Sequence, residues 1–192
     1  YLGEKELFHD VAIRTPLIVY DPSPSADAHR GSVESSHMVE AIDLLPTFIE
    51  AVGGRPNCDR IEGHSLLPLL RGGKVDRWRD IVVNEFDYSF RTATRLELKR
   101  PPKQCGMVTL RDFDWKYVHC EGFRPMLFDL RADPNEFFDL GASAAHEHIR
   151  RQYQAKLGSW VSARKRFSNV SNEFVQNWLM DERFNGMQIG RW

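Results

Sequence analysis

Two short stretches of the 192-residue chain hold the side chains best suited to a reaction site. Near the start, Lys5 and His9 stand close to Asp10 and Arg14. A lysine ammonium is a compact cation that binds anionic oxygens, and a histidine exchanges a proton near neutral pH. As residue types alone, most such side chains are solvated, and Asp10 and Arg14 suit an ion pair that ties a loop to a strand. The residue types therefore allow an anion site here without establishing it.

The second stretch reads Asn-Glu-Phe-Asp-Tyr, in which Glu85, Asp87 and Tyr88 could line the mouth of a substrate site. A position at the edge of a sheet explains these residues equally well. His119 and Cys120 resemble a pair of metal ligands, but neighbouring residues of a strand point to opposite faces. We therefore expect no metal site at that pair.

Composition excludes several classes of partner. The formal net charge is −1, so a general polyanion-binding surface and a nucleic-acid partner are not expected. The longest apolar run, residues 16–20, is far shorter than the roughly 20 residues of a membrane helix. Three cysteines without a CxxC pair favour free thiols over a disulfide, hence a reducing compartment. The cytoplasm is the expected location, and the periplasm stays open because the true N-terminus is not seen.

The elements that would position these residues change in type along the chain. The apolar run 15–20 predicts a strand covered on both faces. Residues 42–54 repeat apolar side chains at helical spacing, with a proline in the first turn and a glycine pair as the stop. Residues 65–70 predict one short helical turn. The basic residues that follow indicate a solvated loop: Arg91, Arg95, Lys99, Arg100 and Lys103.

The second half predicts an antiparallel sheet with a helix across it. Strands are expected at 81–83, 107–111, 115–120 and 126–130, with a tight hairpin at 112–114. A long helix over 144–167 should carry one apolar stripe, namely Ile149, Tyr153, Leu157 and Trp160. The tail, residues 168–192, holds two tryptophans and is expected to dock on the chain itself or on a partner subunit.

Three blocks of the sequence resemble the sulfatase family of the alkaline phosphatase superfamily, most closely its phosphonate monoester hydrolase-like branch. The first (residues 3–16) places a lysine, an aromatic residue, an acid and an Arg-x-Pro step before an apolar strand. The second joins Asp-Leu-Leu-Pro-Thr (43–47) to Gly-His-Ser-Leu-Leu-Pro-Leu-Leu (63–70). The third joins Trp-Lys-Tyr (115–117) to Leu-Phe-Asp-Leu-Arg-Ala-Asp-Pro-Asn-Glu (127–136).

The resemblance implies hydrolysis of sulfate, phosphate or phosphonate esters. In the family, a formylglycine made from Cys or Ser in C/S-x-P-x-R attacks the sulfur or phosphorus, aided by a divalent metal (Ca, Mn or Zn). No cysteine here is followed by x-Pro-x-Arg, and Asp-His-Gly is absent. The nucleophile and metal ligands are therefore expected upstream of Tyr1, with none of the metal ligands in this chain. Lys5 matches the family lysine that contacts the non-bridging and leaving oxygens, although Glu4 stands where a glycine is usual.

We therefore expect an α/β fold: the end of an alkaline-phosphatase-like α/β sheet core, then a small four-stranded antiparallel sheet with a packed C-terminal helix. Residues 1–79 would end the core, 80–167 would form the small subdomain, and 168–192 would be a docking or oligomerisation tail, giving a homo-oligomer. Lys5 is the expected catalytic residue, and His9, Glu85, Asp87 and Tyr88 are weaker substrate-binding candidates. The missing N-terminal catalytic part is the expected partner. The alternative is a non-catalytic truncated relic or assembly module.

Overall fold

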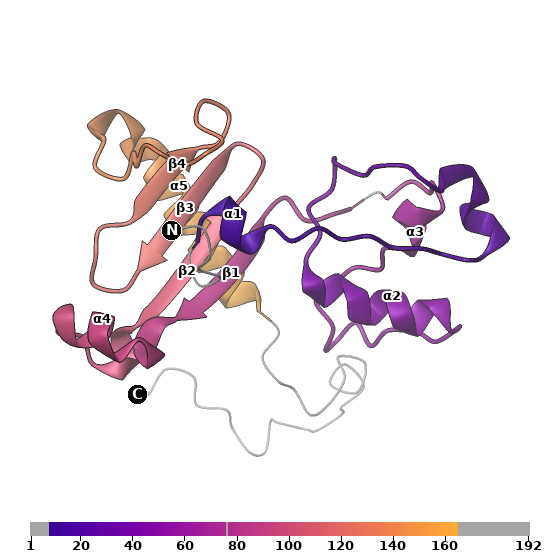
Figure 1. Cartoon of the computed structure of the whole chain (residues 1–192), viewed down its shortest axis with the longest axis horizontal. Helices are drawn as coiled ribbons and strands as arrows, with labels where there is room; N and C mark the ends of the chain where they lie inside the picture. The colour runs from indigo at the N-terminus through magenta and orange to yellow at the C-terminus, as the bar shows by residue number, and fades with distance from the viewer. Residues whose placement is uncertain (1–7, 76, 165–192) are drawn as a thin grey trace, which may run out of the picture.

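The computed structural model describes residues 8–75 and 77–164. Figure 1 shows two lobes: one is built on a sheet with helix α1 (Asp10–Ile13) lying against it, and the other holds α2 (Leu44–Ala51) and α3 (Leu67–Leu70). The chain therefore starts on the sheet lobe, crosses to the second lobe, and returns to form the sheet. The earliest described residues and the C-terminal half thus share one lobe.

The sheet has four antiparallel strands in the order in which they occur in the chain. They are β1 (Val82–Asp87), β2 (Gly106–Arg111), β3 (Trp115–Cys120) and β4 (Met126–Asp129). The hairpin between β2 and β3 turns on Asp112, whose Oδ1 accepts the backbone N–H groups of Asp114 and Trp115 at 3.0 and 2.8 Å. The four strands predicted between residues 81 and 130, the hairpin and the small antiparallel sheet are confirmed.

One face of the sheet is covered by helix α5 (Glu147–Ala163), which follows the short 3₁₀ helix η5 (Ala144–His146). The alternation along the strands sends every second side chain to this face. Ile149 and Trp160 pack against the cluster from the margins, so the predicted apolar stripe is the buried one. The buried residues of this cluster are Leu110, Tyr117, Leu127, Tyr153 and Leu157.

The opposite face carries a second apolar cluster and helix α1. Phe8 packs there against the ring of Phe128, with ring centroids 5.9 Å apart. Phe86 of β1 contributes from the edge. The buried residues of this second cluster are Met107, Val118, Phe128 and Leu130. The N-terminal segment is therefore part of the core of the sheet lobe.

In the second lobe, the carboxylate of Asp43 holds three segments together. It accepts the backbone N–H of Glu40 at 2.8 Å, the N–H of His64 at 2.7 Å, and both Nη groups of Arg79. Burial raises the pKa of Asp43, but the Arg79 hydrogen bonds and the two N–H groups outweigh it and lower the pKa overall. The hydroxyl of Thr47 donates to the Asp43 carbonyl and accepts the Leu66 N–H at 2.8 Å. The Asp-x-x-x-Thr spacing therefore joins α2 to the loop before α3.

The described elements differ from expectation in two places. The apolar run 15–20 forms no strand in the described part of the chain, because a parallel-type strand needs neighbours that no described residue supplies. The basic run contains helix α4 (Thr92–Glu97), flanked by the 3₁₀ helices η3 (Tyr88–Phe90) and η4 (Pro102–Gln104), where a loop was expected. The helices predicted at 42–54 and 65–70 are confirmed, preceded by η2 (Ala41–Asp43). A further 3₁₀ helix, η1 (Pro24–His29), lies in the predicted loop.

Three further sequence expectations concern the cysteines, membrane-spanning helices and the C-terminal tail. Cys58, Cys105 and Cys120 are free thiols, exposed, buried and half-buried respectively. Within residues 8–75 and 77–164, no helix has the length and apolar character to cross a bilayer. The tail that was expected to dock, residues 168–192, lies outside the described residues.

The packing at Gly63 gives a test of the second lobe. A Cβ at this position would stand 2.0 Å from the backbone carbonyl oxygen of Ile42, which cannot move away as a side chain can. We expect Gly63→Ala to destabilise the protein by about 2 kcal/mol or more in urea unfolding. Gly158→Ala in α5 is the matched control, because its Cβ meets nothing within 4 Å, and it should stabilise by about 0.5–1 kcal/mol. Equal effects of the two substitutions would contradict this packing.

Candidate functional site

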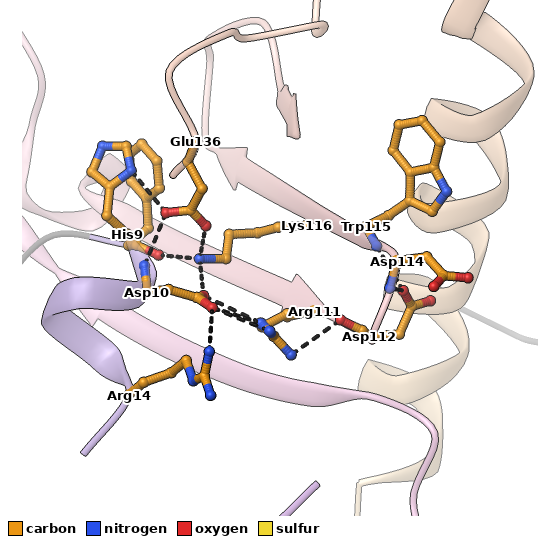
Figure 2. A network of polar contacts seen from close by, with 10 residues as sticks. His9, Asp10, Arg14, Arg111, Asp112, Asp114, Trp115, Lys116 and Glu136 are labelled. Atoms are coloured by element: carbon orange, nitrogen blue, oxygen red, sulfur yellow. Dashed lines mark hydrogen bonds and ion pairs between the residues drawn. The ribbon is translucent and has the colours of Figure 1, made fainter. Parts of the chain in front are cut away.

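The ammonium of Lys116 is buried on the α1 face of the sheet, with the residue 0% exposed. It donates to the carbonyl of Phe8 at 3.0 Å and forms ion pairs with the carboxylates of Asp10 and Glu136. Figure 2 shows these acceptors converging on the Lys116 nitrogen. An ammonium has three donors, so this buried charge is fully paired.

Glu136 approaches the cluster from the turn after β4. One carboxylate oxygen faces Lys116, and the other accepts the backbone N–H of Asp10 at 2.9 Å and lies 3.0 Å from Nδ1 of His9. The residue is 5% exposed, and its backbone has φ +59°, a left-handed conformation that is costly for a residue with a Cβ. The turn therefore accepts local strain at the residue that points its carboxylate inward.

Asp10 carries the second negative charge of the cluster. Besides Lys116, its carboxylate meets the guanidinium of Arg111 at 3.1–3.2 Å and that of Arg14 at 3.7 Å. Burial raises the pKa of Asp10, but the Lys116 ammonium and then Arg111 outweigh it and hold the pKa below its ordinary value. The expected ion pair with Arg14 is present, while Lys116 and Arg111 are the nearer partners.

We call these residues, namely His9, Asp10, Arg111, Lys116 and Glu136, the ion cluster. Its charged groups are matched with one another, so none is left free to attack or protonate a substrate. Within the described ranges, no three or more His, Cys, Asp or Glu side chains are grouped to hold a metal ion. The arrangement suits anchoring, because it fastens the segment at residues 8–10 to the sheet.

The predicted site residues are dispersed. Lys5 lies outside the described residues. His9 belongs to the ion cluster, with a third of its side chain exposed. Glu85 pairs with Arg164 at 3.0 Å, and Asp87 accepts the Ser89 N–H at 2.8 Å. The Tyr88 hydroxyl donates to the Gln104 carbonyl at 3.4 Å.

Strand register separates these candidates. Glu85 and Asp87 alternate with Phe86, which joins the cluster on the α1 face, so both carboxylates lie on the α5 face. His9 lies with α1 on the other face. The structure therefore does not bring His9 together with Glu85 and Asp87 in one site. A substrate contact by any one of them stays a prediction.

Sequence analysis missed Lys116 and Glu136 as a pair. The signal was present in β3, where Lys116 shares its face with Val118 and Cys120 and so points toward the core. A lysine at an inward position needs a counter-charge. Its partner is 20 positions later and could not be chosen from several acids by spacing alone.

Removal of Lys116 tests the cluster. In Lys116→Met, the buried Glu136 and half-buried Asp10 lose their common counter-charge, so the free energy of unfolding should fall by about 3–5 kcal/mol. Lys116→Met combined with Glu136→Met should recover much of this loss. The buried Glu136 charge is then gone, and the remaining carboxylate, Asp10, keeps Arg111 as its partner. Urea unfolding of both variants measures the difference, and additive losses would show that the two side chains are not coupled.

Comparison with known proteins gives a consistent result. Residues 2–163 match the family model described as N-sulphoglucosamine sulphohydrolase, C-terminal. The multifunctional alkaline phosphatase superfamily protein PehA of Trinickia caryophylli is 35% identical over 153 residues, covering 78% of this chain and 29% of that protein. A Delta 4,5-hexuronate-2-O-sulfatase of Bacteroides thetaiotaomicron is 27% identical over 161 residues, covering 82% and 30%.

Solved structures agree with these sequence relatives. The phosphonate monoester hydrolase of Agrobacterium radiobacter superposes with a TM-score of 0.60 at 32% identity, over 66% of this chain and 25% of that one. The phosphonate monoester hydrolase of Silicibacter pomeroyi gives 0.61 at 26%, over 72% and 27%. The chain spans less than a third of the length of these relatives. With its four-stranded antiparallel sheet and packed helix, the chain belongs to the C-terminal domain family of the sulfatases, within the alkaline phosphatase superfamily.

Proposed function

We propose that this chain is the C-terminal part of a metal-dependent hydrolase of sulfate, phosphate or phosphonate esters. The observation that carries the proposal is the family match over residues 2–163, whose relatives include sulfatases and phosphonate monoester hydrolases. That range includes Lys5, in the block that resembles the family lysine. Its ammonium would bind the non-bridging oxygens of the ester and the leaving oxygen, where negative charge develops during cleavage.

The nucleophile and the divalent metal are assigned to a missing N-terminal part. The described residues do not fit a metal ion, because they contain no suitable group of ligating side chains. No catalytic step is therefore routed through this chain except anion binding by Lys5. His9, Glu85, Asp87 and Tyr88 stay individual proposals for substrate contact, because His9 lies on the opposite face of the sheet from Glu85 and Asp87. The proposed metal is Ca, Mn or Zn.

An exposed apolar surface supports a missing part. Thr47 of α2 and Asp43, the residue just before this helix, are buried, whereas Leu45 and Phe48 on the other side of α2 are 56% and 62% exposed. Ile18 of the unpaired apolar run is 93% exposed. A surface helix normally buries its apolar side and exposes its polar side to water, so α2 has the opposite arrangement. We call the apolar side of α2 and its flanking residues the open face; its residues are Ile42, Leu45, Phe48 and Val52.

The proposed division keeps residues 1–79 as the end of the catalytic core, although the segment at residues 8–10 packs on the sheet lobe. Residues 80–167 are the small subdomain, and 168–192 are a docking or oligomerisation tail. The proposed compartment is the cytoplasm. A non-catalytic relic or assembly module would have the same fold, so the experiments below must separate it from an enzyme.

The first experiment measures hydrolysis by the polypeptide that joins this chain to its upstream part. Activity toward 4-nitrophenyl sulfate, 4-nitrophenyl phosphate and a 4-nitrophenyl phosphonate monoester is compared for wild type and Lys5→Ala. We expect at least one substrate to be cleaved, and Lys5→Ala to lower kcat/KM by about 100-fold or more, because an anion-binding cation acts on the transition state. No hydrolysis of any ester would favour the non-catalytic alternative.

The second experiment tests the open face. When the upstream part is expressed as a separate chain, this chain should bind it and restore hydrolysis. Phe48→Asp would place a charge in the apolar contact and should weaken binding by about 100-fold or more. Val161→Asp is the matched control, since Val161 is 51% exposed on α5, away from the open face, and should bind as wild type does. Equal binding by both variants would show that the upstream part packs elsewhere.

A further inference from the structure

We propose that the connection between β1 and β2 is a docking surface for an anionic lipid bilayer. This connection folds into η3, α4 and η4 over residues 88–104, and the turn at residues 121–124 lies beside it. We call these two segments the α4 corner. The inference goes beyond the proposed function and does not depend on hydrolysis, because none of the side chains that would touch the bilayer is assigned to catalysis or to substrate.

The α4 corner carries positive charge that the described residues do not neutralise. Residues 88–104 hold five lysines and arginines but one acid, Glu97, although the whole chain has a formal net charge of −1. Exposed arginines elsewhere on the sheet lobe are paired, as Arg131 is with Asp114. An uncompensated cationic surface attracts an anionic one. The cations of the corner that form no ion pair with any described residue are Arg95, Lys99, Arg100 and Lys103.

Exposed apolar side chains stand among these cations. Phe90 is 87% exposed and Leu96 is 62% exposed, and Leu98 and Phe123 are exposed as well. The guanidinium of Arg100 lies 4.5 Å from the centroid of the Phe123 ring and donates to the carbonyl of the residue before it at 2.8 Å. The turn and the α4 segment therefore form one surface, in which apolar and cationic groups are neighbours.

The backbone at the end of α4 is a second observation. Lys99 follows the C-cap residue Leu98 and has φ +51°, a left-handed conformation. Helices commonly end on a left-handed residue, but glycine usually occupies that position because a Cβ makes the conformation costly. Here the cost is accepted at a position that adds a cation beside the exposed Leu98.

A bilayer matches both kinds of side chain. Anionic headgroups pair with lysine and arginine, and the boundary between headgroups and acyl chains takes up apolar side chains to a depth of about 5–10 Å. A soluble polyanion would pair with the cations but would leave Leu96 and Leu98 in water. Figure 1 shows α4 at the end of the sheet lobe, away from α2 and its open face. The upstream part that is proposed to bind the open face therefore leaves the α4 corner available to a flat surface.

The test uses the polypeptide that joins this chain to its upstream part, sedimented with vesicles of phosphatidylcholine alone or mixed with phosphatidylglycerol. We expect binding to the mixed vesicles to be at least about 10-fold tighter and to weaken in high salt. Lys99→Gln with Lys103→Gln should lower the affinity by about 10- to 30-fold, since each cation near an anionic surface contributes about 5-fold. Phe90→Ser with Leu96→Ser should lower it by about 10-fold or more, because two apolar side chains no longer insert.

Matched variants make the same kinds of change away from the α4 corner. Arg131→Gln with Arg151→Gln removes two exposed cations, one beside the β2–β3 hairpin and one on α5. Phe113→Ser with Phe137→Ser removes two exposed phenylalanines; Phe113 lies in that hairpin, at the opposite end of the strands from α4. Both variants should bind the mixed vesicles within about 2-fold of wild type, because the attraction falls off within a Debye length.

Three results would overturn the proposal. The first is that the wild-type polypeptide does not bind the mixed vesicles. The second is that the matched variants lose as much binding as the variants of the α4 corner. The third is that binding falls when Lys99 and Lys103 are changed but not when Phe90 and Leu96 are changed, because the corner would then bind anions without an apolar contact, as it would a soluble polyanion.

Discussion

The structure depends on one buried ammonium. Lys116 is inside the sheet lobe, and a charge without partners there would cost several kcal/mol. Its counter-charges come from Glu136, in the turn after β4, and from Asp10, 106 positions earlier. The sheet can therefore close its α1 face only when the N-terminal segment docks on it. A hydrophobic substitute could supply equal stability, but it would not choose this segment and this register as charge pairing does.

The two lobes differ in how much of their apolar surface is covered. The sheet lobe has a covered core on each face, with α5 on one side and the segment around α1 on the other. The second lobe is organised by polar contacts around Asp43, while the apolar side of α2 faces water. Ion-pair networks can hold a lobe in shape without enclosing an apolar core. Exposed apolar side chains gathered on one side of a helix are typical of surfaces that pack against other protein, which is the role proposed above for the open face.

Sequence predicted the elements whose information is local. The alternation of apolar residues predicted the strands, and helical spacing predicted the apolar stripe of α5. The turn sequence at residues 112–114 predicted the hairpin. The run at 15–20 was a weaker case, because β structure depends on neighbours that the described residues lack. Helix α4 was missed because its charged, threonine-containing sequence has no apolar stripe. The ion cluster was beyond local reasoning: an inward lysine signals that an acid is needed, but Asp10 and Glu136 are selected only by the fold.

Most of the described residues in the three sequence blocks that resemble the family have structural roles. Asp43 and Thr47 tie α2 to the loop before α3, and Gly63 makes room for a carbonyl. The Trp-Lys-Tyr and Asp-Pro-Asn-Glu segments contact each other through the ion pair between Lys116 and Glu136. A motif match in the described part of these blocks is thus evidence of shared architecture. Because the charges of the ion cluster are matched with one another, the cluster itself suits anchoring of the segment at residues 8–10 to the sheet better than binding of a substrate.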